Sequence, residues 1–213
     1  MAQKILIFDL DGTLTDSGEG IINCAILALE HFGLPVPSRE ELRVFVGPPL
    51  HETFMKFGVP ADKTDEAIKV YRSRYTTVGK FENFPYPGIP EMLQKLKNAG
   101  HRLFVATSKP EGMAQEIMAK FELSPYFEII CGATLDKSRS EKADVIAYLL
   151  QKIGPAGKAV MVGDTAYDVI GAAAHGIPCI GVAWGYGSTA DMQKAGAQGI
   201  AHTTEELYDM LTQ

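Results

Sequence analysis

Short apolar runs alternate with helix-like patterns along most of the chain. Five runs of four or five residues, rich in Val, Ile and Phe, cover residues 5–8, 103–106, 128–131, 159–162 and 178–182. Such runs predict strands that are buried on both faces of a parallel sheet. Between the runs, apolar residues recur at the spacing of one helix face, as at Ile89, Leu93 and Leu96. This alternation predicts a doubly wound α/β sheet.

The interval 16–82 contains no run of this kind. Its apolar residues, beginning with Ile21, Ala25 and Leu29, follow helical spacing, and prolines and glycines separate the helical segments. A segment with two prolines, 84–88, then returns the chain to the alternating pattern. We therefore predict a Rossmann-like core formed by residues 1–15 and 83–213, with an all-helical cap domain, residues 16–82, inserted after the first strand.

Composition and charge narrow the class of protein. The 213 residues are 46% hydrophobic and 22% charged, which is typical of a globular chain. The net charge of −6 and the scattered basic residues argue against nucleic acid as a partner. No apolar run reaches the ~20 residues of a membrane span, and no secretory signal is expected. Cys24, Cys131 and Cys179 lie far apart, which favours a reducing cytoplasm.

The first candidate site follows the first predicted strand. Asp9 and Asp11 are two residues apart, so in an extended chain both side chains point to the same side. They stand at the carboxyl edge of the sheet, where open α/β sheets bind ligands. Adjacent carboxylates repel one another unless a cation or a shared proton compensates. A calcium loop is excluded because the twelfth residue, counted from Asp9, is Gly20 rather than Glu.

A second acidic pair follows the fourth apolar run. Asp164 stands at the end of a predicted strand, and Asp168 lies in the opening turn of the next helix. By themselves these two residues fit a simple helix N-terminus. Together with Asp9 and Asp11 they complete an all-oxygen site that suits Mg²⁺ better than zinc.

A third polar segment, Thr107, Ser108 and Lys109, ends another predicted strand immediately before a helix. Hydroxyls and amides at such a position bind phosphate, although many only cap the helix. Lys142 lies early in a later predicted helix, close to Ser138, which has the capping-box spacing from Glu141. Taken alone, Lys142 would be interpreted as an ordinary surface lysine. Only its position in the order of motifs makes it a candidate site residue.

These motifs, in this order, resemble the four motifs of the haloacid dehalogenase superfamily. The matching residues are Asp9-Leu10-Asp11-Gly12-Thr13, Thr107, Lys142, and Gly163-Asp164 with Asp168. The resemblance covers essentially the whole chain and includes a helical cap between the first and second motifs. The chain is most similar to the phosphoglycolate phosphatase branch, which includes 5′-nucleotidase-like members. Further similar stretches are Phe45-Val46-Gly47-Pro48-Pro49-Leu50, Tyr86-Pro87-Gly88 and Trp184-Gly185-Tyr186-Gly187.

The resemblance implies a phosphomonoesterase that works through an aspartyl-phosphate intermediate. Asp9 would be the nucleophile, and Asp11 would act as general acid and then as general base. Mg²⁺ would be held by the Asp9 carboxylate, the Asp11 backbone carbonyl and Asp164. Asp168 would act behind these ligands or through water.

The remaining motif residues would contact the substrate. Lys142 would pair with the nucleophile and the transferring phosphoryl group, and Thr107 would donate a hydrogen bond to a phosphoryl oxygen. Ser108 and Lys109 would add phosphate contacts. Arg43, in the cap domain, is the candidate to bind a substrate carboxylate or a second phosphate; an arginine that is merely exposed on a short helix is the alternative.

The identity of residue 11 favours particular reactions within the superfamily. Departure of an alkoxide needs an acid, so Asp11 indicates phosphomonoesters or phosphomutase chemistry. A phosphoglycolate phosphatase-like activity on a small phosphorylated metabolite is expected. A 5′-nucleotidase, a sugar phosphomutase similar to β-phosphoglucomutase, and a binding module with a relic site are the alternatives. The expected chain is a cytoplasmic monomer or homodimer that binds neither nucleic acid nor membrane.

Overall fold

A computed structural model describes residues 3–136, 138–154 and 157–213. The chain divides into two compact units, the first formed by Met1–Thr15 with Pro85–Gln213 and the second by Asp16–Phe84. Across the described ranges, every helix is too short or too polar to cross a membrane.

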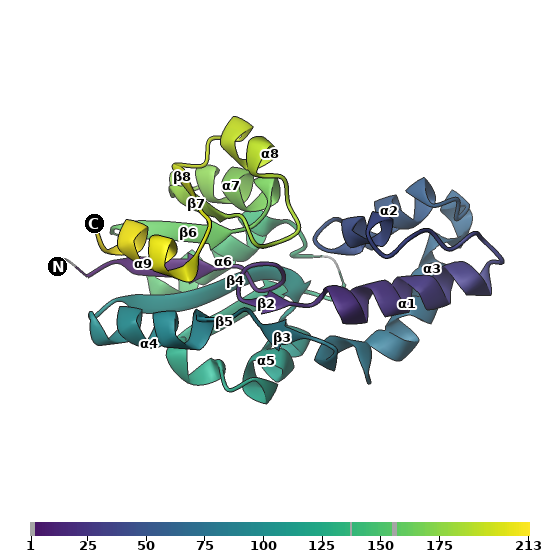
Figure 1. Cartoon of the computed structure of the whole chain (residues 1–213), viewed down its shortest axis with the longest axis horizontal. Coiled ribbons are helices and arrows are strands. Elements are labelled where there is room, and N and C mark those ends of the chain that lie inside the picture. Colours follow the sequence, from purple (N-terminus) through teal and green to yellow (C-terminus); the bar gives the residue numbers. More distant parts are fainter. Residues whose placement is uncertain (1–2, 137, 155–156) are drawn as a thin grey trace. The chain divides into compact units, whose positions relative to one another are not determined.

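A parallel sheet of six strands forms the centre of the first unit (Figure 1). Its order is β5-β4-β1-β6-β7-β8, and every neighbouring pair runs parallel. The strands are β1 (Ile5–Phe8), β4 (Arg102–Pro110), β5 (Ile129–Ala133), β6 (Ala159–Gly163), β7 (Cys179–Val182) and β8 (Gly199–Ala201). Counted along the core alone, this is the 3-2-1-4-5-6 order of the Rossmann fold. The prediction of a doubly wound parallel sheet is confirmed.

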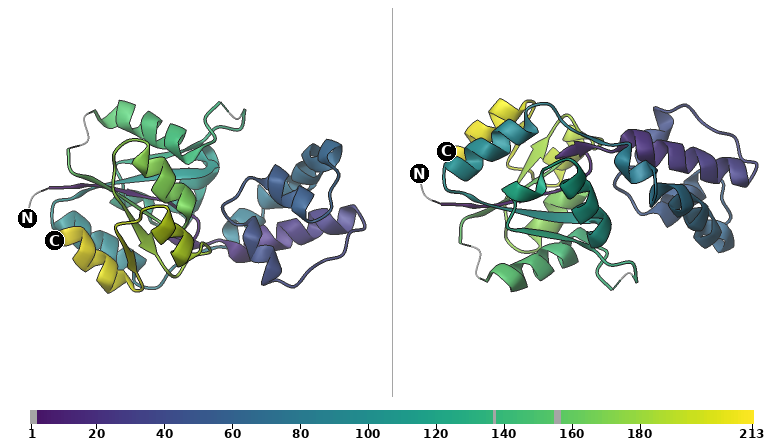
Figure 2. Two further views of the ribbon diagram at one scale, coloured as in Figure 1. Left: turned by 90° about the horizontal axis from the view of Figure 1, so that it is seen from above. Right: turned by 90° about the horizontal axis from the view of Figure 1, so that it is seen from below.

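Helices cover both faces of this sheet. Figure 2 shows α6 on one side and α4 with α9 on the other. The apolar residues of α4, α5 and α9 pack with one face, and those of α6, α7 and α8 pack with the opposite face. The bounds are α4 (Ile89–Asn98), α5 (Glu111–Lys120), α6 (Lys142–Ile153), α7 (Ala166–Ala173), α8 (Thr189–Lys194) and α9 (Thr204–Thr212). The result is a three-layer α/β/α core.

Strand β1 is buried on both faces because its side chains alternate between the two helical layers. Leu6 and Phe8 pack with α4, α5 and α9, whereas Ile7 packs with α6 and α7. Phe8 is paired with Val105 of β4 on one side and with Val162 of β6 on the other. The strand order changes side at β1, because β4 and β5 follow on one side of it and β6, β7 and β8 on the other. The residues after Phe8 therefore lie at the position where this fold opens a crevice.

A tight turn follows β1. The carbonyl of Leu10 accepts hydrogen bonds from the amides of Thr13 at 3.2 Å and Leu14 at 2.9 Å. Gly12 has a φ of +81°, and a Cβ at this position would collide with the carboxyl group of Asp164. The turn therefore needs glycine for both its backbone conformation and its close approach to a second loop.

Helices and the loops between them make up the described part of the second unit, apart from the strand residues at its two ends. It contains α1 (Gly18–His31), η1 (Glu41–Phe45), α2 (Leu50–Lys56), η2 (Ala61–Lys63), α3 (Thr64–Tyr75) and η3 (Gly79–Phe81). Helix α1 packs along α3, and Phe45, Phe54 and Tyr71 form an aromatic core between the helices. Two strands, β2 (Thr15–Asp16) and β3 (Phe84–Pro85), pair where the chain leaves the first unit and returns to it.

Candidate active site

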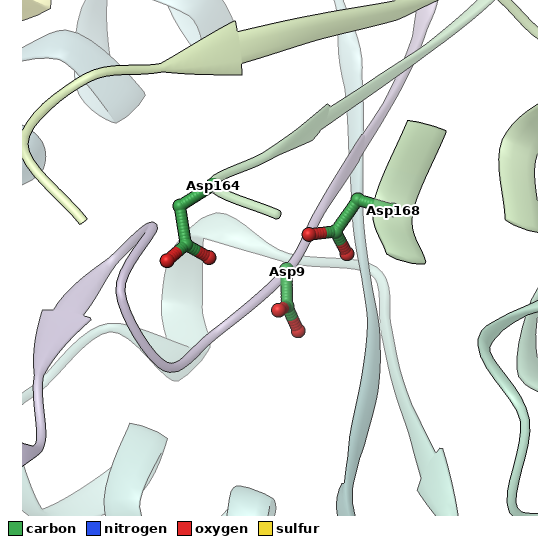
Figure 3. Close-up of side chains that lie close together, drawn as sticks. All are labelled: Asp9, Asp164 and Asp168. Atoms are coloured by element: carbon green, nitrogen blue, oxygen red, sulfur yellow. The ribbon is translucent and has the colours of Figure 1, made fainter. Parts of the chain in front are cut away.

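Three carboxyl groups meet at the carboxyl edge of the central sheet (Figure 3). Asp9 directly follows β1, Asp164 directly follows β6, and Asp168 lies in the first turn of α7. One oxygen from each of them lies within 4.8 Å of the others. The residues are 8%, 1% and 0% exposed, respectively. Adjacent parallel strands end side by side, and this geometry brings together the two acidic motifs, which are far apart in the sequence.

Lys142 is the cation of this cluster. Its Nζ lies 2.8 Å from Oδ1 of Asp9 and 2.8 Å from Oδ1 of Asp168. It also donates a hydrogen bond to the carbonyl of Ala106 at 3.0 Å. Burial by itself lowers the pKa of Lys142, but the carboxylates of Asp168 and Asp9 more than offset this effect and raise its pKa above the usual range. Lys142 is therefore a buried, permanently charged group and not a surface lysine.

Asp168 connects the helix start to this lysine. Its Oδ2 accepts hydrogen bonds from the amide of Thr165 at 3.0 Å and from the Thr165 hydroxyl at 2.7 Å, which forms a capping box at α7. A Cβ on Gly163 would collide with the Asp168 side chain. Because one oxygen caps the helix and the other faces Lys142, Asp168 is arranged to orient the lysine.

Asp164 is held by neutral donors. Its Oδ1 accepts a hydrogen bond from the hydroxyl of Thr13 at 3.3 Å, and its Oδ2 accepts one from the amide of Tyr186 at 2.8 Å. A Cβ on Gly185 would collide with Asp164, as one on Gly12 would. The loops after β1 and β7 thus close tightly around this carboxyl group and fix its direction.

The acidic cluster fits a divalent cation. Three buried carboxyl groups face one lysine, so negative charge is in excess. Burial raises the pKa of Asp9 to about 6, although Lys142 opposes the shift. Burial, with repulsion from Asp168 and Asp9, raises the pKa of Asp164 to about 8. Oδ1 of Asp9 is buried and makes no hydrogen bond of good geometry to the described residues, despite its ion pair with Lys142. Oxygen ligands with uncompensated charge match Mg²⁺.

Asp11 lies beside the cluster and pairs with a different lysine. The Nζ of Lys109 lies 2.9 Å from Oδ1 and 2.7 Å from Oδ2 of Asp11. Thr107 is buried, and its Oγ1 accepts a hydrogen bond from the amide of Lys109 at 3.2 Å. Ser108, between these two residues, is exposed. Of the three polar residues expected at the end of β4, the structure therefore turns Thr107 and Lys109 inward and Ser108 outward.

Arg43 belongs to η1 of the second unit. Its Nε lies 3.7 Å from Oε1 of Glu40, and its side chain is partly exposed. A contact with substrate stays a prediction for this residue.

The loop after β7 contributes contacts that sequence reasoning did not assign. Trp184 Nε1 donates a hydrogen bond to the carbonyl of Thr13 at 3.1 Å, and the Tyr186 amide donates to Asp164. A Cβ on Gly187 would collide with the Asp164 carbonyl. The signal was the Trp-Gly-Tyr-Gly stretch itself, because paired glycines after a strand indicate a close backbone approach.

Comparison with known proteins identifies related chains. The protein is 44% identical to the "Tyrosine-protein kinase PtkA" of Mycobacterium tuberculosis, over 98% of this chain and 72% of the relative. It is 41% identical to a "5′-nucleotidase" of Pseudomonas aeruginosa, over 88% and 86% of the two chains. A "Phosphoglycolate phosphatase" of Caulobacter vibrioides is 30% identical over 93% and 86%.

Solved structures with a similar fold point to the same family. A crystal structure of a predicted phosphatase from Clostridium acetobutylicum superposes with a TM-score of 0.93 at 40% identity, over 100% of this chain and 99% of that one. The family model described as "Haloacid dehalogenase-like hydrolase" matches residues 6–182, which include every strand-end carboxylate of the site. The chain belongs to the haloacid dehalogenase-like hydrolase family.

Proposed function

We propose that the protein is a Mg²⁺-dependent phosphomonoesterase that hydrolyses a small phosphorylated metabolite through an aspartyl-phosphate intermediate. The observation that carries this proposal is the placement of Asp9. Its carboxyl group ends the central strand, lies 2.8 Å from the buried ammonium of Lys142, and shares a cluster with Asp164. A carboxylate so oriented and charge-compensated is suited to nucleophilic attack on phosphorus.

In the first step, an oxygen of Asp9 forms a bond to phosphorus while the bond from phosphorus to the ester oxygen breaks. The electron pair of the broken bond leaves with that oxygen, which takes a proton from the carboxyl group of Asp11. Lys142 stabilises the negative charge near the attacking oxygen, and Thr107 donates a hydrogen bond to a phosphoryl oxygen.

In the second step, Asp11 is a carboxylate. It takes a proton from a water molecule as the water oxygen attacks phosphorus. The bond between phosphorus and Asp9 breaks, and the electron pair returns to the Asp9 carboxylate. The products are inorganic phosphate and the original enzyme.

The carboxylates of Asp9 and Asp164, with the backbone carbonyl of Asp11, would hold Mg²⁺. When bound, the ion supplies positive charge that offsets the repulsion between the nucleophile and an anionic phosphate. Asp168 would not bind the ion directly, since one of its oxygens accepts a hydrogen bond from Thr165 and the other pairs with Lys142. The tight packing of Asp164 against Gly12 preorganises the ligand set.

Phosphoglycolate is the first candidate substrate, supported by the resemblance of the motifs and by the 30% identical relative of that name. Arg43 is the proposed contact for its carboxylate. A nucleoside 5′-monophosphate is the second candidate. The relative named 5′-nucleotidase, at 41% identity, supports this second candidate.

Phosphate release across a panel of esters tests the proposal. The panel contains phosphoglycolate, nucleoside 5′-monophosphates and hexose phosphates, with Mg²⁺ or with a chelator, and Asp9→Asn is the control variant. We expect the wild type to release phosphate from one class of ester when Mg²⁺ is present, and the Asp9→Asn variant to release none. Equal release by the variant, or a sugar phosphate isomerised with no free phosphate, contradicts the proposal.

Because one relative is named a tyrosine kinase, transfer from ATP to protein tyrosine is assayed in parallel, and that activity without ester hydrolysis would also overturn the proposal.

A further inference from the structure

We propose that Lys109 is a positioning residue for Asp11: it holds the carboxyl group that protonates the leaving group, and it does so through a buried ion pair. This inference deepens the proposed function and rests on it. It also assigns Lys109 a role other than the phosphate contact expected from sequence.

The ion pair is close and shielded from solvent. Both oxygens of Asp11 lie within hydrogen-bond distance of the same ammonium, at 2.9 and 2.7 Å. The side chains of Lys109 and Asp11 are 4% and 14% exposed. Charge-assisted contacts of this length in a poorly hydrated site restrict the carboxyl group strongly. When one Asp11 oxygen carries the proton for the leaving group, the other still accepts from Lys109.

The backbone explains why Lys109 reaches Asp11 rather than solvent. Phe8 pairs with Val105, so the residues that follow these two positions run side by side beyond the sheet edge. The register of β4 shifts between Thr107 and Pro110. The hydrogen bond from the Lys109 amide to Thr107 Oγ1 stabilises this irregular segment.

A neighbouring glycine supports the same segment. The backbone carbonyl of Lys109 lies close to Gly132 of β5, where an added Cβ would meet it at 2.5 Å. A larger residue would push the end of β4 outward, and the ammonium with it. The position of Lys109 is thus fixed from its backbone as well as from its side chain.

Two kinds of lysine are distinguished by this arrangement. Lys142 serves the nucleophile, because its ammonium lies 2.8 Å from Asp9. Lys109 serves the acid, because its ammonium lies on Asp11. The two carboxyl groups of the Asp9-Leu10-Asp11 segment are therefore each held by a separate buried cation, which keeps their roles apart.

The first experiment compares leaving groups. Lys109→Met keeps the length of the side chain and removes its charge, and Lys120→Met, at an exposed position on α5, is the matched control. We expect Lys109→Met to lose kcat on the order of 100-fold for alkyl phosphates, whose leaving oxygen needs a proton. The loss for p-nitrophenyl phosphate, which needs little protonation, should be several times smaller. Equal losses on both esters would overturn the positioning role in favour of a contact with the phosphoryl group.

A double-variant cycle sharpens this result. In an Asp11→Asn background, Lys109→Met should have little further effect on alkyl phosphates, since the group that it positions no longer acts. A full, independent loss in that background would also overturn the inference. If Lys109→Met does not fold, Lys109→Gln takes its place in both experiments.

Thermal unfolding of the same variants tests the ion pair without any substrate. The decrease in Tm for the double variant Asp11→Asn, Lys109→Met should be smaller than the sum of the two single decreases. Additive decreases would overturn the pairing even in an enzyme that is fully active. If the wild type releases phosphate from no ester, the proposed function is wrong, and the positioning role is wrong with it. Coupled Tm values would still show that Lys109 and Asp11 form an ion pair.

Discussion

The ammonium of Lys142 lies 2.8 Å from Oδ1 of Asp168, a carboxyl group with no solvent-exposed surface. The second oxygen of the same carboxyl group caps helix α7. One side chain therefore joins the start of a helix to the lysine that faces Asp9. Lys142, the proposed catalytic lysine, is therefore held by a residue whose proposed role needs no contact with substrate.

Asp168→Asn should lower kcat by ~10- to 100-fold, the range found when a supporting partner of an active-site group is removed. The amide keeps the size of the side chain but loses the charge that orients Lys142. Thr165→Ala is the matched control, because it removes one cap hydrogen bond and leaves the ion pair. It should cost ~1 kcal/mol of stability with little effect on rate. Similar rates for both variants would assign Asp168 a role in the helix alone.

Asp9→Asn should abolish turnover while the protein stays folded. An amide oxygen is a poor nucleophile, and the side chain has the same shape, so circular dichroism and the unfolding transition should keep the form seen for wild type. Steady-state phosphate release is the measurement. A kcat within about tenfold of wild type would exclude an aspartyl-phosphate mechanism.

Asp164→Asn should weaken Mg²⁺ binding. Mg²⁺ that binds only the folded state raises Tm by mass action, so wild type should show a Tm that climbs with Mg²⁺ concentration. The variant should show a much smaller rise. Without metal and above pH 8, where the Asp164 carboxyl group is ionised, the variant should be more stable than wild type, because it removes one of the three clustered negative charges. An identical Mg²⁺ response in both proteins would place the metal elsewhere.

The metal-free protein should lose stability as the pH rises. Asp164 has its pKa raised to about 8, and Asp9 to about 6, from a value of 3.8. Between pH 3.8 and the raised pKa of each group, the folded state binds more protons than the unfolded state. Each protonated carboxyl group therefore stabilises the folded state fully below the unfolded pKa, and this stabilisation is lost as the pH rises through the folded pKa. The Tm of wild type should fall from pH 5 to pH 8 more steeply than the Tm of Asp164→Asn. Parallel curves would show that the Asp164 carboxyl group does not titrate in this interval.

Arg43→Ala should reduce kcat/KM for phosphoglycolate and leave nearly unaffected an aryl phosphate whose aryl group carries no charge. One charge-assisted contact of ~1.5–3 kcal/mol corresponds to a loss of roughly 10- to 150-fold. Arg39→Ala is the control, since Arg39 donates a hydrogen bond to Asn23 within the same unit. Equal losses on both substrates would make Arg43 structural.

The central strand and its carboxylates were predictable from sequence for a simple reason. Strand β1 is flanked on both sides and buried on both faces, so its residues are uniformly apolar and its end is abrupt. Asp9 stands at that end, and its side chain is buried in the acidic cluster. Strand β8 was missed because Gly199–Ala201 is a three-residue strand at the edge of the sheet, with one buried residue. Such a segment has no periodicity to detect.

The connections between motifs were the harder part. Ser138 and Glu141 have the spacing of a capping box, yet α6 begins at Lys142 without a side-chain cap, because the Ser138 hydroxyl donates to Asp136 within a turn. The capping box lies instead at Thr165 and Asp168. Sequence spacing marks both pairs equally as capping boxes. It does not reveal that the Ser138 hydroxyl donates to Asp136 instead of capping the helix.

The ion pair between Lys109 and Asp11 joins residues that are 98 positions apart. Both residues belong to recognised motifs, but their partnership depends on the register of β1 and β4 and on the shift at the end of β4. A motif gives the kind of side chain at a strand end. The register of the sheet decides which side chains become partners.

Trp184 is the only tryptophan in the chain, and its indole nitrogen donates to the carbonyl of Thr13, in the turn that follows Asp11. The emission of this single tryptophan is therefore expected to respond to changes in the turn that follows Asp11. In the proposed mechanism, Mg²⁺ binding, phosphoryl transfer to Asp9 and product release would each change the surroundings of that turn. The protein thus carries an intrinsic fluorescent probe with which these proposed steps could be timed without a label.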